Sequence, residues 1–142
     1  MNGISWGPAT EPAILADNSV SAAGAGAAKF QPPPKRLVTG GNDNKVNMWT
    51  ITECGNAPEQ VTIGAHTDWV RDVAWCSNIG LMHEMVASCS EDGTCKVWVT
   101  QGDGKVANSW NERPVIALEG VPLWKVSWSQ VGNMLSIAGG DN

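Results

Sequence analysis

The chain has 142 residues, a length that suits one domain with a sizeable core. Its 9 Lys and Arg against 14 Asp and Glu give a formal net charge of −5, which argues against nucleic acid as a main partner because phosphate binding needs clustered basic residues. No apolar run approaches the roughly 20 residues of a membrane span, so we expect membrane contact only indirectly, through partners.

Eight Trp, one Phe, no Tyr, 16 Gly and many short runs of Val, Ile and Ala indicate an all-β fold. Residues 8–35 are rich in Ala, Gly, Ser and Pro and predict a long surface loop. Three successive units of short strands follow from the apolar runs. In chain order the expected strands are 3–6, 36–41, 46–51 and 60–64, then 69–76, 85–90, 95–100 and 114–118, then 123–129 and 134–139.

A repeat relates these units. The stretch "TGGNDNKVNMW" matches "SCSEDGTCKVW" at an offset of 49 residues, and the same offset again reaches "AGGDN". The aspartates of the three copies are Asp43, Asp92 and Asp141. Each is followed by Asn or Gly, the residue types that best accept a left-handed backbone, so all three copies predict tight hairpin turns.

Units of four short strands at a period of roughly 40–50 residues are typical of propeller blades. The sequence therefore predicts about two and a half four-stranded blades. We place the first blade at 1–64, the second at 65–118 and an incomplete third at 119–142.

The stretch "GAH…DWV…VAW…VASCSEDGTCKVW" resembles a WD repeat, with Ala65 and Val99 departing from the usual pattern. "HTDWVRDVAW", "ASCSEDG", "WKVSWS", "AGGDN" and "ISWGPA" together resemble the Sec-thirteen family of small WD-repeat propellers. Members of that family have six blades and about twice this length, so the resemblance implies a partial propeller.

The resemblance implies a non-enzymatic scaffold in the COPII vesicle coat, which serves transport from the endoplasmic reticulum to the Golgi, and in the outer ring of the nuclear pore. The implied partners are a Sec-thirty-one-like coat subunit and a subunit of the Y-shaped nuclear pore complex. The implied location is cytoplasmic, at endoplasmic reticulum membranes, COPII vesicles and nuclear pores. The alternative is another WD-repeat adaptor, in a related nuclear pore or signalling complex.

His66, Ser88 and Asp92 raise a third hypothesis, a hydrolase, because these residue types can act as base, nucleophile and orienting carboxylate. Ser88 lacks the G-x-S-x-G elbow, however, and only the aspartate recurs in all three units. In WD repeats such residues form a structural network with a tryptophan. We therefore expect a structural role for a set of eight residues, namely His66, Ser88, Asp92, Trp98, Thr39, Asp43, Trp49 and Asp141.

Arg71 and Asp72 are adjacent in a predicted strand and so point to opposite faces. One interpretation is that either residue makes an ion pair between blades. The other is that Trp69, Arg71 and Trp124 lie on an exposed rim as candidate partner contacts, since aromatic and Arg side chains anchor interfaces.

The four cysteines show no C-x-x-C spacing, and the loop residue His83 is the remaining histidine. We expect no metal, no cofactor and reduced thiols. Cys89 and Cys95 flank a predicted hairpin turn, so a disulfide between them stays open at this point.

Overall fold

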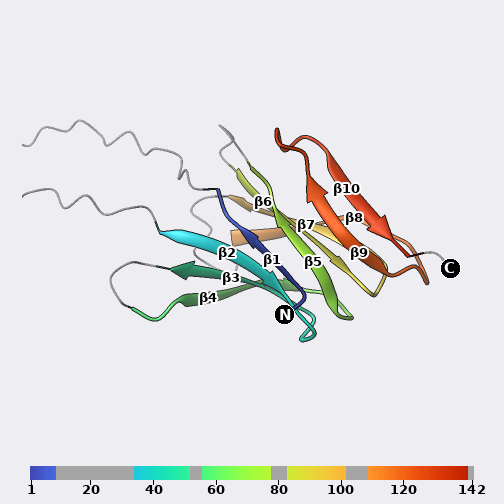
Figure 1. The fold of residues 1–142 in the computed structure, drawn as a ribbon, viewed down its shortest axis with the longest axis horizontal. Coiled ribbons are helices and arrows are strands. Elements are labelled where there is room, and N and C mark those ends of the chain that lie inside the picture. The colour runs from blue at the N-terminus through green and yellow to red at the C-terminus, as the bar shows by residue number, and fades with distance from the viewer. Residues whose placement is uncertain (9–33, 52–55, 78–82, 102–108, 141–142) are drawn as a thin grey trace, which may run out of the picture.

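The computed structural model describes residues 1–8, 34–51, 56–77, 83–101 and 109–140. Within these residues, ten strands form three antiparallel sheets in chain order (Figure 1). The first sheet has the order β1-β2-β3-β4, the second β5-β6-β7-β8, and the third pairs β10 with β9. This arrangement is a partial β-propeller with two four-stranded blades and two strands of a third, as the sequence predicted.

The strands lie close to the positions expected from the apolar runs. The first sheet contains β1 (Gly3–Trp6), β2 (Lys35–Gly40), β3 (Lys45–Ile51) and β4 (Glu59–Ala65). The second contains β5 (Val70–Trp75), β6 (His83–Ser90), β7 (Thr94–Gln101) and β8 (Trp110–Ala117). The third contains β9 (Leu123–Trp128) and β10 (Leu135–Gly139).

Strand β8 is the main departure, because it begins at Trp110 rather than near Pro114. Trp110 is buried and meets Trp75 edge to face, with ring centroids 6.3 Å apart. This packing and the pairing of Trp110 with Thr100 extend the strand backwards. Most of the predicted loop 8–35 lies outside the described residues.

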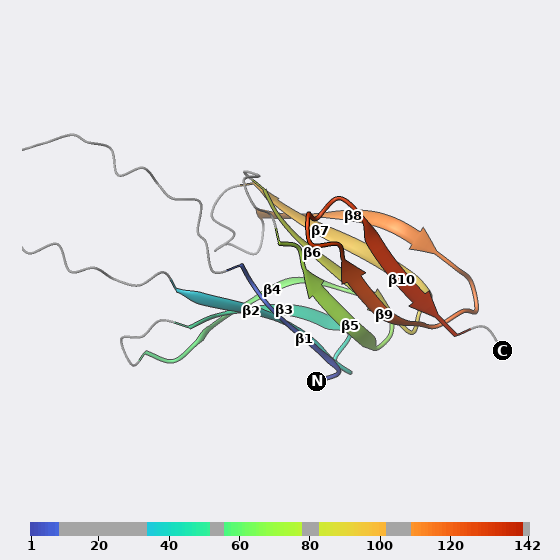
Figure 2. The ribbon, with the colours of Figure 1, turned by 45° about the horizontal axis from the view of Figure 1, so that its top comes forward.

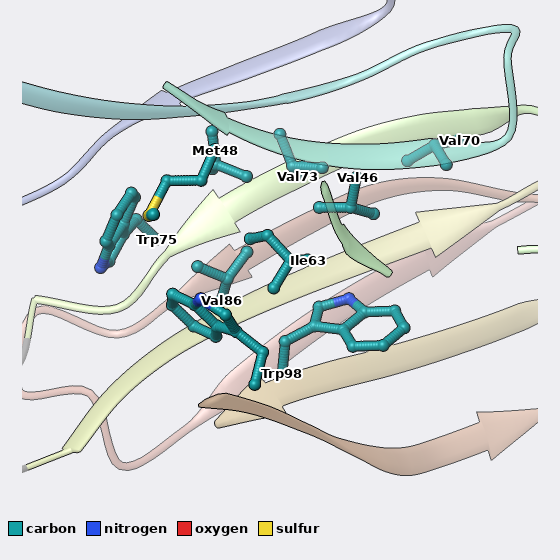
Figure 3. Packing of buried hydrophobic residues seen from close by; sticks show 10 residues of the cluster. Val46, Met48, Ile63, Val70, Val73, Trp75, Val86 and Trp98 are labelled. Carbon is teal, nitrogen blue, oxygen red and sulfur yellow. The ribbon is translucent and has the colours of Figure 1, made fainter. Parts of the chain in front are cut away.

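The first strand of each sheet contacts the first strand of the next, so β1, β5 and β9 lie side by side (Figures 1 and 2). The sheets fan out from this inner row. An apolar cluster fills the space between the first two sheets, and it includes Met48, Ile63, Trp75, Val86 and Trp98 (Figure 3). A second cluster lies between the second and third sheets.

The C-terminal half of β6 is buried on both faces, because it lies between the two apolar clusters and its successive residues point in opposite directions. Along β6, Val86 belongs to the first cluster, and Ala87 and Cys89 belong to the second. Ser88 and Ser90, the alternating polar positions, are fully buried as well. Their hydroxyl groups therefore need partners inside the protein.

In the part of the chain that the structure describes, no helix has the length and apolarity needed to cross a membrane.

Candidate functional site

Two of the predicted hairpin turns have the left-handed backbone conformation expected from the sequence. Asn44 has a φ of 63°, and Gly93 has a φ of 78°. Both values lie in the left-handed region that Asn and Gly tolerate best. A Cβ atom on Gly93 would also lie 2.1 Å from the carbonyl oxygen of Leu118, so the turn needs glycine for space as well as for conformation. The third predicted turn, at Asp141, lies outside the described residues.

The second sheet brings His66, Ser88 and Trp98 together. His66 precedes β5, Ser88 lies on β6 and Trp98 on β7. Ser88 Oγ lies 2.7 Å from His66 Nε2 and accepts a 2.9 Å hydrogen bond from Trp98 Nε1. All three side chains are buried, so these bonds satisfy polar groups that would otherwise be costly to bury.

Asp92, in the turn between β6 and β7, accepts four hydrogen bonds. The backbone N–H and hydroxyl of Thr94 donate to Oδ1 at 2.8 and 2.6 Å. The backbone N–H and hydroxyl of Thr67 donate to Oδ2, each at 3.0 Å. Burial by itself raises the pKa of Asp92, but these bonds outweigh burial and hold the pKa well below the usual 3.8.

His66 links the two halves of this network. Its Nδ1 lies 2.9 Å from Thr94 Oγ1 and 3.4 Å from Asp92 Oδ2. Since Trp98 can only donate and the carboxylate can only accept, the bonds run in one direction from the indole to Asp92. This direction assigns the ring proton to Nδ1 and leaves Nε2 to accept from Ser88. A neutral ring agrees with the pKa of His66, which burial lowers below 6.5 against the opposing effect of Asp92.

The order Ser88, His66, Asp92 resembles a nucleophile, its base and an orienting acid. Ser88 has no exposed surface, however, and its oxygen already contacts the imidazole and the indole. The Ser88 hydroxyl is therefore enclosed within the network in this structure. The arrangement joins β6, β7 and the loop before β5, and every polar atom of the Asp92 carboxylate is used in doing so.

The first sheet repeats half of this network. Trp49 Nε1 donates to Thr39 Oγ1 at 2.9 Å, the same distance as the equivalent bond from Trp98 to Ser88. Asp43 accepts only a long 3.4 Å bond from the backbone of Lys45. A groove of about 600 Å³ lies over this sheet. Its lining includes Ile4, Leu37, Thr39, Asp43, Trp49 and Ile51.

The candidate partner contacts converge on one guanidinium group. Arg71 Cζ lies 5.2 Å from the ring centre of Trp69 and 4.8 Å from that of Trp124, so the guanidinium is flanked by two indoles. Arg71 Nη2 also pairs with Glu91 at 2.5 Å. The two indoles are 43% and 44% exposed, so this aromatic clamp (Trp69, Arg71 and Trp124) presents large ring surfaces to solvent.

The ion pairs refine the two interpretations of Arg71 and Asp72. The ion-pair partner of Arg71, Glu91, lies in the turn between β6 and β7 of the same blade. Asp72 is the residue that reaches the next sheet, where it accepts a 3.2 Å bond from the backbone of Val126 and lies 3.4 Å from Lys125 Nζ. Another pair between sheets, which sequence patterns did not indicate, joins Arg36 on β2 to Glu84 on β6.

Cys89 and Cys95 lie directly opposite each other on β6 and β7, but both thiols are free and fully buried. Burial, helped by Asp72, raises the pKa of Cys89 to about 12, and burial raises the pKa of Cys95 to about 11. Thiols with such pKa values are poor nucleophiles near neutral pH. Among the described residues, no cluster of three His, Cys, Asp or Glu side chains could hold a metal ion.

Sequence reasoning missed Thr67 and Thr94, which supply all four donors to Asp92. Their positions carry a weak signal. Thr94 lies two residues after Asp92, where a side-chain carboxylate commonly accepts from the backbone in a turn. Thr67 is distant in sequence, and only the folded chain brings it to the carboxylate.

Comparisons with known proteins agree with this geometry. The family model described as "WD domain, G-beta repeat" matches residues 58–99, which contain His66, Ser88, Asp92 and Trp98. Over 143 residues the chain is 38% identical to the "Protein SEC13 homolog" of Homo sapiens, covering 99% of this chain and 41% of the human protein.

Similar relatives occur in a fungus and an insect. The "Protein transport protein sec13" of Emericella nidulans is 39% identical over 145 residues, covering 100% of this chain and 42% of the relative. The "Protein SEC13 homolog" of Drosophila melanogaster is 37% identical over 142 residues, covering 100% of this chain and 36% of the relative. The chain thus spans less than half the length of these relatives. With its WD repeat, its sheets of four strands and this similarity along its whole length, the chain is a Sec13-like WD-repeat protein.

Proposed function

We propose that the chain is part of a non-enzymatic scaffold that takes part in protein transport. The similarity of the whole chain to relatives named as protein transport proteins carries this proposal. The family resemblance points to the COPII vesicle coat and the outer ring of the nuclear pore. The matching locations are the cytoplasmic face of the endoplasmic reticulum, COPII vesicles and nuclear pores, with membrane contact made only through the coat.

The structure supports a holding rather than a reacting role. Of the residues most like a catalytic triad, His66 and Ser88 are buried, and all three are engaged in hydrogen bonds within the network that includes Thr67, Thr94 and Trp98. We propose that the network of His66, Ser88, Asp92 and Trp98 fixes the turn of the second blade to the loop before it. We likewise propose blade boundaries at 1–64, 65–118 and 119–142.

The proposed partners are proteins: a Sec-thirty-one-like coat subunit and a subunit of the Y-shaped nuclear pore complex. The aromatic clamp is the candidate contact surface, because exposed tryptophans beside an arginine are typical of residues that dominate binding energy. The negative net charge again argues against nucleic acid as a partner.

Co-precipitation tests the proposed function. The protein that contains this chain should co-precipitate with a fragment of a Sec-thirty-one-like coat subunit, and with a Y-complex subunit in a parallel assay. Retention of neither partner by the folded protein would contradict the scaffold role in these assemblies and favour another WD-repeat adaptor.

A further inference from the structure

The aromatic clamp occupies equivalent positions on neighbouring strands. Trp75 ends β5, Trp128 ends β9, and Arg71 and Trp124 each lie four residues before these tryptophans. Because β5 and β9 are in contact, the two positions face each other across the boundary between the second and third sheets. The clamp therefore belongs to two sheets and depends on their packing.

The guanidinium in the clamp is held in place before any ligand arrives. Arg71 Cζ lies within 5.2 Å of the centres of both indoles, and Glu91 pairs with Nη2. The backbone N–H of Glu91 donates to the carbonyl of Trp69 at 3.0 Å, which fixes the acid beside the first indole. Arg71 Nε is buried without an acceptor, so ring stacking and one ion pair set the position of this side chain. A rigid surface of this kind loses little entropy when it binds.

The chemistry of the clamp selects against a charged ligand. Arg71 and Glu91 neutralise each other, which leaves no net charge between the rings. Nearly half of each indole is exposed. Within the described part of the chain, no residue accepts a hydrogen bond from Trp69 Nε1, whereas Trp124 Nε1 lies against Gly140, where an added Cβ atom would be only 2.4 Å away. The surface thus offers two flat apolar rings and the unused N–H of Trp69, which suit a ligand that has apolar rings and a hydrogen-bond acceptor.

An extended proline-containing segment has these properties. In the polyproline II conformation its pyrrolidine rings can pack on aromatic faces, while its carbonyl groups, which make no internal hydrogen bonds, accept from indole N–H groups. We infer that the aromatic clamp binds a proline-rich segment of a protein partner. This inference rests on the proposed scaffold function and adds the class of segment that the scaffold recognises.

The test uses the full chain, a polyproline peptide, and a polyglutamate peptide of equal length. Polyproline should shift the indole N–H signals of Trp69 and Trp124 in NMR spectra, and its affinity should change less than about twofold with salt, since no net charge is involved. Trp69→Ala and Trp124→Ala should each weaken binding at least about tenfold. Trp6→Ala is the matched control, because Trp6 is 60% exposed at the far end of β1 and should leave the affinity unchanged.

Three results would overturn the inference: binding of polyglutamate in preference to polyproline, equal losses in Trp6→Ala and Trp69→Ala, or no shift of either indole with polyproline. Co-precipitation with the coat subunit separates this failure from failure of the proposed function. If the protein does not bind polyproline but still co-precipitates with the coat subunit, only the inference about the aromatic clamp is contradicted. If the unmodified protein does not co-precipitate with the coat subunit, the proposed function is contradicted instead.

Discussion

The first and second sheets carry the same repeat but stabilise it to different extents. Both place a hydroxyl, an aspartate and a tryptophan at an offset of 49 residues, and both make the tryptophan-to-hydroxyl bond at 2.9 Å. In the second sheet a histidine and two threonines complete the network, and the aspartate accepts four bonds. In the first sheet the aspartate accepts one long bond beside an open groove.

The difference shows that residues from the neighbouring sheet, and from the segment that follows it, supply the missing partners of the hydrogen-bond network. Within the second sheet, Trp98 is covered by β4 of the first sheet, and a Cβ atom on Gly64 would lie 2.2 Å from its ring. The chain then continues from β4 through His66 and Thr67, which reach Ser88 and Asp92. No described segment covers Trp49 in this way, so its sheet keeps the repeat residues without their partners.

The largest expected difference between the sheets comes from their aspartates. Asp92→Ala should lower the free energy of unfolding by about 3 kcal/mol, because it leaves hydrogen-bond donors of Thr67 and Thr94 without an acceptor. Asp43→Ala should cost at most about 0.5 kcal/mol, since it removes one long, exposed bond. Denaturant unfolding followed by tryptophan fluorescence measures both. Equal losses would mean that the two networks contribute alike.

A smaller effect is expected from the close approach of β4 to Trp98. Gly64→Ala should destabilise the chain by about 2 kcal/mol, because the ring must move to admit a methyl group. In Gly41→Ala, in the first hairpin, the new Cβ would lie 3.1 Å from the flexible side chain of Asp43 and at an ordinary 3.8 Å from Met1, so stability should change by no more than about 0.5 kcal/mol. The same unfolding measurement applies, and a neutral Gly64→Ala would show that Trp98 relaxes freely.

The smallest expected effect is a dependence on pH that only the second sheet carries. Burial lowers the pKa of His66 in the folded chain, so the unfolded chain binds the proton more readily. The contribution of His66 is therefore complete above pH 6.5 and is lost as the pH falls below it, by at most about 1.4 kcal/mol per pH unit. The pKa of Asp92 is lowered too, so its contribution persists until the pH falls below 3.8.

Unfolding midpoints at about pH 7.5 and about pH 5.5 check this dependence, since the interval brackets the ordinary histidine pKa. The unmodified chain should be less stable at the lower pH, and His66→Gln should reduce that difference. An unchanged difference in His66→Gln would place the titrating group elsewhere.

Much of the fold followed from local patterns. Alternation of apolar residues and the Asp-Asn and Asp-Gly turns located nine of ten strands to within two residues, because strand period and left-handed turns are properties of short segments. Strand β8 began earlier than predicted because Trp110 packs on Trp75, a residue of another strand. Similarly, no local pattern predicted the ion pair between Arg36 and Glu84, because the two residues lie on different sheets.

The sequence by itself determined the repeat, its first two turns and four members of the network, His66, Ser88, Asp92 and Trp98, because each of these depends on residue type and spacing along a few strands. Only the tertiary structure decided which copy of the network is complete, that the ion pair to the next sheet is made by Asp72, and that Trp124 of β9 meets the guanidinium of Arg71 on β5. These features depend on how one sheet packs against the next, and the contacts between sheets join residues too far apart in the chain for a local pattern to specify.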